Sequence, residues 1–128
     1  MLIRLAAAGA LLLGAVFVAV TPAAAATACD VTYTANQWNT GFTADVRITN
    51  RGAALTSWTL TFTVPANVTL TNGWSGTWTQ SGSTITVRNA AWNGSLGSGA
   101  TTSTGFQASF TGATPAGPGN FALNGTPC

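Results

Sequence analysis

Apolar and polar residues alternate with a period of two along several segments of this chain. In FTADVRI (42–48) Phe42 and every second residue after it are apolar, and in WTLTFTV (58–64) the apolar positions alternate with threonines. Shorter versions occur in residues 84–87, 105–110 and 121–123. Successive side chains of a β-strand point to opposite faces, so each segment predicts a strand with one buried face. Beyond residue 28, no stretch has the 3.6-residue period of an amphipathic helix.

Clusters of Gly, Asn, Ser and Pro separate these segments. They are NRG, PAN, TNG, QSGS, NGSLGSG and TPAGPG. Short strands rich in threonine and aromatic residues, divided by such turns, are typical of an antiparallel β-sandwich, and we predict an all-β domain of that kind. TPAGPG is expected to be a loop before the last strand.

The first 28 residues have the features of a secretory signal peptide. Arg4 precedes an apolar run (5–20), and small residues follow it up to Ala28. We expect cleavage after Ala26 or Ala28, which leaves one secreted domain (29–128) and no membrane segment.

Two cysteines, Cys29 and Cys128, lie at the two ends of the predicted domain. In an exported protein, which meets an oxidising environment, we expect them to form a disulfide bond. An alternative is that Cys29 is the acylated residue of a lipoprotein, because ATAC weakly resembles the cleavage site of that class; Cys128 would then be unpaired.

Charged residues are scarce beyond residue 28. They are Asp30, Asp45, Arg47, Arg51 and Arg88, which give a net charge of +1 from three arginines and two aspartates. This number of cations predicts no basic patch for a nucleic acid or an anionic membrane.

The same scarcity argues against catalysis. Glycoside hydrolysis normally needs two facing carboxyl groups, and a serine nucleophile needs a base, yet the domain has no His, Lys or Glu. We therefore predict a non-catalytic protein without a metal or cofactor, whose partner is neutral and rich in hydroxyl groups.

The tryptophans fall into two environments. Trp58 is in phase with Leu60 and Phe62, which predicts a core position, whereas small or polar residues surround Trp38 (NQWNTG), Trp74 (TNGWSG) and Trp92 (AAWNGS). Any one of these three could still belong to the core. Together they predict an exposed aromatic surface, suited to the C–H face of a sugar ring. Trp78 is expected on the same side of a continuous strand as Trp74, in a cross-strand packing role.

These motifs, in order, resemble those of family 2 carbohydrate-binding modules, the bacterial cellulose-binding type. The segments that carry the resemblance are NQWNTGF, RITNRG, SWTLTF, NGWSGT, VRNAAWNGSL, TGFQASF and FALNGTPC. The resemblance implies a β-sandwich with Greek-key connections, of the immunoglobulin-like or jelly-roll-like kind, and a disulfide between Cys29 and Cys128.

The resemblance also implies a planar strip of three exposed rings, those of Trp38, Trp74 and Trp92. Its polar neighbours would be Asn36, Asn72 and Gln107, with weaker contacts from Asp45 and Ser103. Gly41 is similar to the glycine that the cellulose-binding subgroup has beside the first tryptophan. An arginine there would turn the Trp38 ring.

The predicted function is therefore that of a secreted, monomeric module that adsorbs to crystalline cellulose or to chitin. Two alternatives stay open at this point. The chain could be a truncated targeting module of a glycoside hydrolase or oxygenase, or its tryptophans could adhere to a protein.

Overall fold

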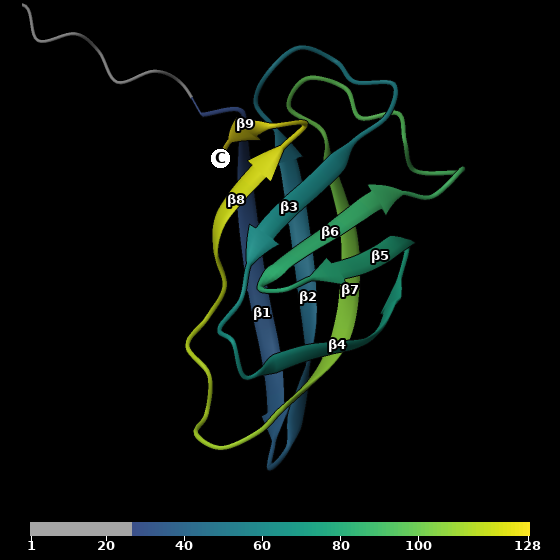
Figure 1. The fold of residues 1–128 in the computed structure, drawn as a ribbon. Helices are drawn as coiled ribbons and strands as arrows, with labels where there is room; N and C mark the ends of the chain where they lie inside the picture. Colours follow the sequence, from purple (N-terminus) through teal and green to yellow (C-terminus); the bar gives the residue numbers. More distant parts are fainter. Residues whose placement is uncertain (1–26) are drawn as a thin grey trace, which may run out of the picture.

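A computed structural model describes residues 27–128, which form nine β-strands (Figure 1). The strands are β1 (Cys29–Trp38), β2 (Gly41–Asn50), β3 (Thr59–Thr63), β4 (Val68–Trp74), β5 (Gly76–Ser81), β6 (Thr84–Asn89), β7 (Thr101–Phe110), β8 (Gly119–Leu123) and β9 (Thr126–Pro127). Within the described residues, no helix has the length and apolar character that crossing a membrane requires. Nearly all of the predicted signal peptide lies outside the described part of the chain.

The strands form two antiparallel sheets packed as a sandwich. One sheet has the order β1-β2-β7-β4 and the other has the order β5-β6-β3-β8-β9. Figure 1 shows β3 and β6 crossing obliquely over β2 and β7. The chain changes sheet between β4 and β5, and β7 returns to lie between β2 and β4. The predicted antiparallel sandwich is confirmed.

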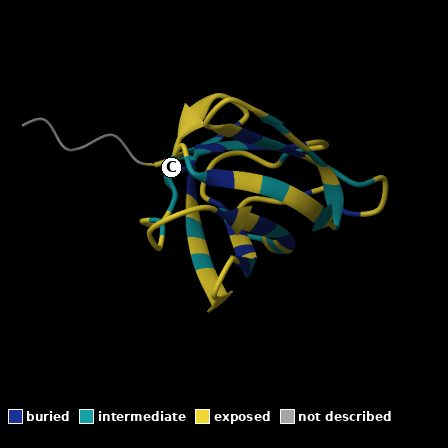
Figure 2. Ribbon diagram, turned by 60° about the horizontal axis from the view of Figure 1, so that its bottom comes forward, coloured by how far each residue is buried: buried dark blue, intermediate teal, exposed yellow. Residues whose placement is uncertain are grey.

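The predicted alternation is confirmed in the central strands. The even-numbered side chains of β2 from Phe42 to Ile48 are buried, as are Leu60 and Phe62 of β3. Figure 2 shows bands of buried and exposed residues alternating along the strands. The inward residues of the two sheets meet in one core, in which burial of each large apolar side chain contributes about 1.5 to 3 kcal/mol.

Trp58 is buried in that core, as predicted. It is 1% exposed, and its indole Nε1 donates a hydrogen bond of 2.8 Å to the carbonyl oxygen of Asn93. A buried indole N–H needs such an acceptor, because leaving it unpaired would cost about 1 to 3 kcal/mol.

The disulfide between Cys29 and Cys128 is also present. It joins the start of β1 to the residue after β9, and the sequence separation is 99. Closing a loop of this length stabilises the folded state by about 4 to 5 kcal/mol in the chain-entropy model. The bond engages the Cys29 sulfur, which argues against the acylated alternative.

The expectation of one continuous strand through Trp74 and Trp78 was wrong. Ser75, between β4 and β5, has a φ of 58°, in the left-handed region, and the chain changes sheet there. Trp78 packs inward, with ring centroids 5.0 Å from Phe106 and 6.2 Å from Phe62. Trp74, on the other sheet, is 41% exposed.

Candidate functional site

The outer face of the four-stranded sheet carries most of the predicted site residues. In the pairing of β1 with β2, Trp38 lies opposite Gly41 and Asn36 lies opposite Thr43. Phe42 and Ala44 of β2 point into the core, so Gly41 and Thr43 point outward, together with their partners on β1. Trp38 is 44% exposed on this face.

Gly41 provides the surface against which the Trp38 ring lies. A methyl group on Gly41 would lie 3.0 Å from Trp38 Cζ2 and 3.2 Å from Cε2, and also 2.6 Å from the backbone oxygen of Ala108. The ring therefore packs against the backbone of β2 on one side. A side chain at position 41 would press on the Trp38 ring and on the backbone of β7.

Trp74 has the same arrangement on β4. It lies opposite Gly105 of β7, and a methyl group on Gly105 would lie 2.5 Å from Trp74 Cε2 and Cζ2. Two outward tryptophans thus lie against cross-strand glycines on one face of one sheet. One face of each ring lies on its glycine, and the strand that carries the glycine does not cover the other face.

A β-bulge in β4 places Trp74 on this outer face. Leu70 lies opposite the buried Ala108, but the register shifts before Asn72, which lies opposite Gln107. Without the extra residue, Trp74 would have the same parity as Leu70 and would point into the core. Bulges commonly re-aim a side chain in this way.

The backbone after the bulge is held by side chains from the core. The carbonyl oxygen of Trp74 accepts hydrogen bonds from Thr104 Oγ1 at 2.7 Å and from Trp78 Nε1 at 3.1 Å. Thr104 is 1% exposed. These bonds fix the end of β4, and with it the base of the Trp74 side chain.

Trp92 lies in the loop between β6 and β7 and is 74% exposed. Its neighbour Asn93 is buried and donates a hydrogen bond from Nδ2 to the carbonyl oxygen of Ser75 at 2.9 Å. The Asn93 carbonyl accepts the Trp58 indole N–H. The loop that carries Trp92 is therefore tied both to the residue after Trp74 and to the core.

Asn93 was not predicted as a site residue. The motif AAWNGS places it beside Trp92, but nothing local in the sequence indicates a hydrogen bond to a turn 18 positions away. Its Oδ1 is the one buried side-chain polar atom without a hydrogen-bond partner among residues 27–128.

The predicted polar neighbours also lie on the outer face. Asn36 on β1, Asp45 on β2 and Asn72 on β4 are exposed, while Gln107 on β7 is half-buried and pairs with both Thr43 and Asn72. Ser103 is exposed farther along β7, opposite Arg47. A shallow groove of about 260 Å³ runs between the strands, and its lining includes Thr34, Asn36, Thr43, Asp45 and Trp74.

The two carboxylates are too far apart to act on one bond. Asp30 lies opposite Thr49 and Asp45 lies opposite Thr34, which separates them by four residues along the strands, about 13 Å. Glycoside hydrolysis needs a separation of about 5 to 9.5 Å. Asp30 also forms an exposed ion pair of 2.6 Å with Arg51.

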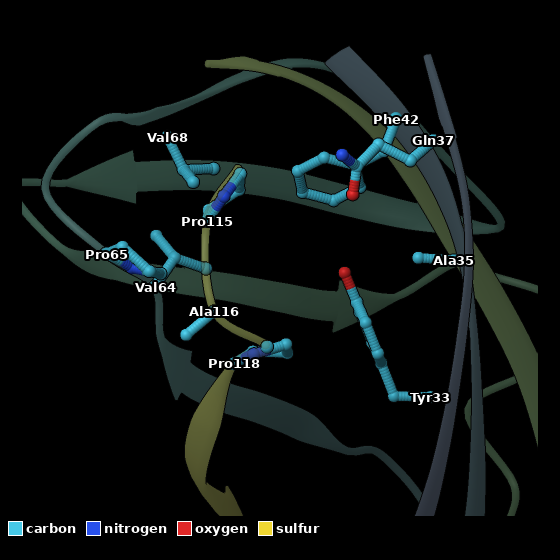
Figure 3. Close-up of a pocket in the computed structure, with 11 residues that line it drawn as sticks. Tyr33, Ala35, Gln37, Phe42, Val64, Pro65, Val68, Pro115, Ala116 and Pro118 are labelled. Carbon is cyan, nitrogen blue, oxygen red and sulfur yellow. The ribbon is translucent and has the colours of Figure 1, made fainter. Parts of the chain in front are cut away.

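Another cavity, of about 200 Å³, lies on the opposite side of β1 from Trp38 (Figure 3). Tyr33 points its hydroxyl toward Phe42 and the loop that contains Pro115 and Pro118. Burial raises the pKa of Tyr33 to about 12. No charged residue lines this cavity, and none of the three exposed tryptophans contributes to it.

A sheet face that displays aromatic rings beside amides is typical of a module that binds a ligand on its surface. Residues 29–128 match the model of a family described as cellulose binding domain. The chain belongs to this family, the family 2 carbohydrate-binding modules.

Named relatives are large enzymes. The chain is 52% identical over 101 residues to exoglucanase B of Cellulomonas fimi, in a match that covers 78% of this chain and 9% of that protein. It is 47% identical over 129 residues to endoglucanase CelA of Streptomyces lividans, covering 99% of this chain and 28% of that protein. The chain thus spans less than a third of either relative.

A solved structure agrees with the fold. The chitin-binding domain of Chi18aC from Streptomyces coelicolor is 37% identical, with a TM-score of 0.61, over 78% of this chain and 93% of that one. The relatives therefore include proteins named for glucan hydrolysis and a domain named for chitin binding.

Proposed function

We propose that this protein is a secreted, non-catalytic module that adsorbs to crystalline cellulose through a strip formed by Trp38, Trp74 and Trp92, hereafter the tryptophan strip. The observation that carries the proposal is that all three rings are exposed, at 44%, 41% and 74%, while Trp58 is buried. Exposed aromatic rings gathered in one region of a small domain favour a ligand that covers them.

The spacing of the rings suits a long, flat ligand. Trp38 lies against Gly41 and Trp74 lies against Gly105; Gly41 pairs with Ser109, four residues from Gly105 on the neighbouring strand. The two rings are therefore separated by about 13 Å along the strands and about 5 Å across them. A chain of several sugar units can cover both rings, whereas a single sugar cannot.

The chemistry of the face suits a neutral polysaccharide. The C–H face of a β-linked glucose can lie on each indole, while its equatorial hydroxyls reach Asn36, Asn72 and Gln107. Stacking of a nucleic-acid base on an aromatic side chain contributes about 1 to 3 kcal/mol, and we use the same range for a sugar on each ring. Gly41 supports the cellulose assignment, because it lets the Trp38 ring lie close to the sheet.

The family and the relatives support a targeting role. We infer that the module acts outside the cell as a monomer and brings an attached glycoside hydrolase to its substrate, as the small share of each relative that it covers suggests. Chitin is the second candidate ligand, favoured by the likeness to a chitin-binding domain. Adhesion to a protein is a third possibility that the same experiment tests.

The test is adsorption to microcrystalline cellulose, chitin and xylan in parallel. We expect Trp38→Ala, Trp74→Ala and Trp92→Ala each to lower the affinity for cellulose by about 5- to 100-fold, the equivalent of one stacked ring. Thr79→Ala, an exposed change on the other sheet, is the matched control and should bind as the original chain does. If the folded tryptophan variants adsorb normally, the strip is not the cellulose-binding surface.

A further inference from the structure

We propose that Asp45 adapts the same face to a cationic amino sugar, so that the module also binds partly deacetylated chitin through its protonated glucosamine units. This inference rests on the proposed function, because it uses the tryptophan strip to position the polysaccharide. It adds cationic amino sugars to the ligands of the module, because aromatic rings and amides alone do not favour a charged sugar over a neutral one.

The position of Asp45 brings its carboxylate beside Trp74. Asp45 lies opposite Thr34 on one neighbouring strand and opposite Gly105 on the other. Gly105 is the residue against which the Trp74 ring lies. Asp45 and Trp74 also line the same groove, together with Thr34 and Asn36. A sugar stacked on Trp74 would therefore have a carboxylate within reach of its edge.

This carboxylate is free to bind a ligand. Among residues 27–128 the one ion pair joins Arg51 to Asp30, and no side-chain hydrogen bond involves Asp45. Arg47 is the nearest cation along the same strand and face, two residues away, or about 7 Å between Cα atoms. The inferred cation site is thus open on the side toward Trp74.

A neutral glucan gains little from an isolated carboxylate, whereas an ammonium group gains a charge-assisted hydrogen bond. The same ammonium can interact with the aromatic face of Trp74. The predicted domain carries a net charge of +1, so long-range attraction does not draw a polycation to it. A preference for glucosamine must therefore come from this local contact.

The test compares Asp45→Asn with Asp30→Asn. Both changes remove one negative charge from an exposed position on the same sheet, but Asp30 lies about 13 Å farther along the strands and is paired with Arg51. Calorimetry would measure binding of fully deacetylated, fully acetylated and cellulosic oligosaccharides of equal length, at a pH at which the amino groups are protonated.

For Asp45→Asn we expect the affinity for the deacetylated oligosaccharide, relative to that for the cellulosic one, to fall by about 1.5- to 5-fold, the range for an exposed ion pair. Asp30→Asn should leave that ratio unchanged. At about 1 M salt, where the Debye length is about 3 Å, the difference between the two variants should become smaller.

The outcomes separate this inference from the proposed function. If the original chain binds cellulose and Asp45→Asn leaves the ratio unchanged, the role of Asp45 is refuted and the tryptophan strip stands. An equal fall in both variants would mean a general charge effect and would also refute it. If the original chain does not bind cellulose at all, the proposed function itself is wrong.

Discussion

The two faces of the four-stranded sheet use tryptophan and glycine in the same way, with opposite results. On the inner side, Trp78 lies against Gly73 of β4, and a methyl group there would be 2.6 Å from the Trp78 Nε1. On the outer side, Trp74 lies against Gly105. Phe62 and Phe106 pack against Trp78, whereas Trp74 is exposed.

The difference shows that the same contact, a tryptophan ring packed on a glycine, contributes to stability on the inner face and to ligand binding on the outer face. A tryptophan ring can pack directly on the backbone at a glycine without a steric clash, because the glycine has no side chain, and this contact restricts the motion of the ring. Inside, further aromatic rings cover it and contribute to folding. Outside, its free surface is held in place for a ligand, and less conformational entropy is lost on binding.

The largest expected effect is in the core between the two sheets. Trp58→Ala removes a fully buried ring and its hydrogen bond to Asn93, so we expect the free energy of unfolding to fall by about 3 to 5 kcal/mol. Trp38→Ala, on the outer face, should lower it by less than about 1 kcal/mol. Urea denaturation of both variants measures the difference, and equal losses would contradict the assignment of Trp58 to the core and of Trp38 to the surface.

Alanine at the two glycines should separate stability from binding. Gly73→Ala should lower the free energy of unfolding by about 1 to 3 kcal/mol, because it overpacks the core against Trp78. Gly105→Ala should instead displace the Trp74 ring and weaken cellulose adsorption by about 5- to 100-fold.

The same two proteins would be compared by denaturation and by adsorption. A Gly105→Ala variant that loses stability but adsorbs normally would mean that the position of the Trp74 ring does not matter for binding.

Asn93 links the two regions, and its removal should have an intermediate effect. Asn93→Ala loses the hydrogen bond to Ser75, which should lower the free energy of unfolding by about 0.5 to 1.5 kcal/mol. The Trp92 loop should then lose its fixed position, and cellulose adsorption should weaken as well. Thr104→Val is the comparison, because it removes the bond to the Trp74 carbonyl while leaving the Trp92 loop tied.

Nuclear magnetic resonance would report this loss as a shift of the Trp92 indole signal with little change at Trp38. Unchanged adsorption and an unchanged Trp92 signal in Asn93→Ala would show that Asn93 has no positioning role.

The last expected effect, absent at neutral pH, is the pH dependence of stability caused by Tyr33. The pKa of Tyr33 is about 12 in the folded chain and about 10 when unfolded, so above pH 10 the unfolded state loses a proton that the folded state keeps. This contribution to stability is present below about pH 10 and is lost as the pH rises toward 12. Denaturation curves should show a decline in that window, and Tyr33→Phe should make it less steep; an identical decline in both chains would exclude Tyr33 as its cause.

Much of the fold could be predicted from local pattern. Alternation predicted β2, β3, β6, β7 and β8, because these strands have a partner strand on both edges and a distinct inside and outside. It missed β1, β4, β5 and β9, which are the edge strands of the two sheets. In β1, Val31 and Tyr33 are only half-buried, so the contrast between the two faces is weak.

Parts of the candidate site depended on features that no local pattern contains. The bulge before Asn72 and the left-handed Ser75 decide that Trp74 points outward and Trp78 inward, although both residues have even numbers. The bond from Asn93 to Ser75 likewise forms only when two distant loops meet. Trp38, Trp74 and Trp92 could be selected from their polar surroundings, but the glycines under two of them required the register.

The most direct test of the tryptophan strip follows all five indole N–H signals by nuclear magnetic resonance while a soluble cello-oligosaccharide is added. The signals of Trp38, Trp74 and Trp92 should shift together with one dissociation constant, while those of the buried Trp58 and the inward Trp78 should stay in place. Shifts confined to one exposed tryptophan, or shifts of Trp58 or Trp78 alone, would contradict a shared binding surface.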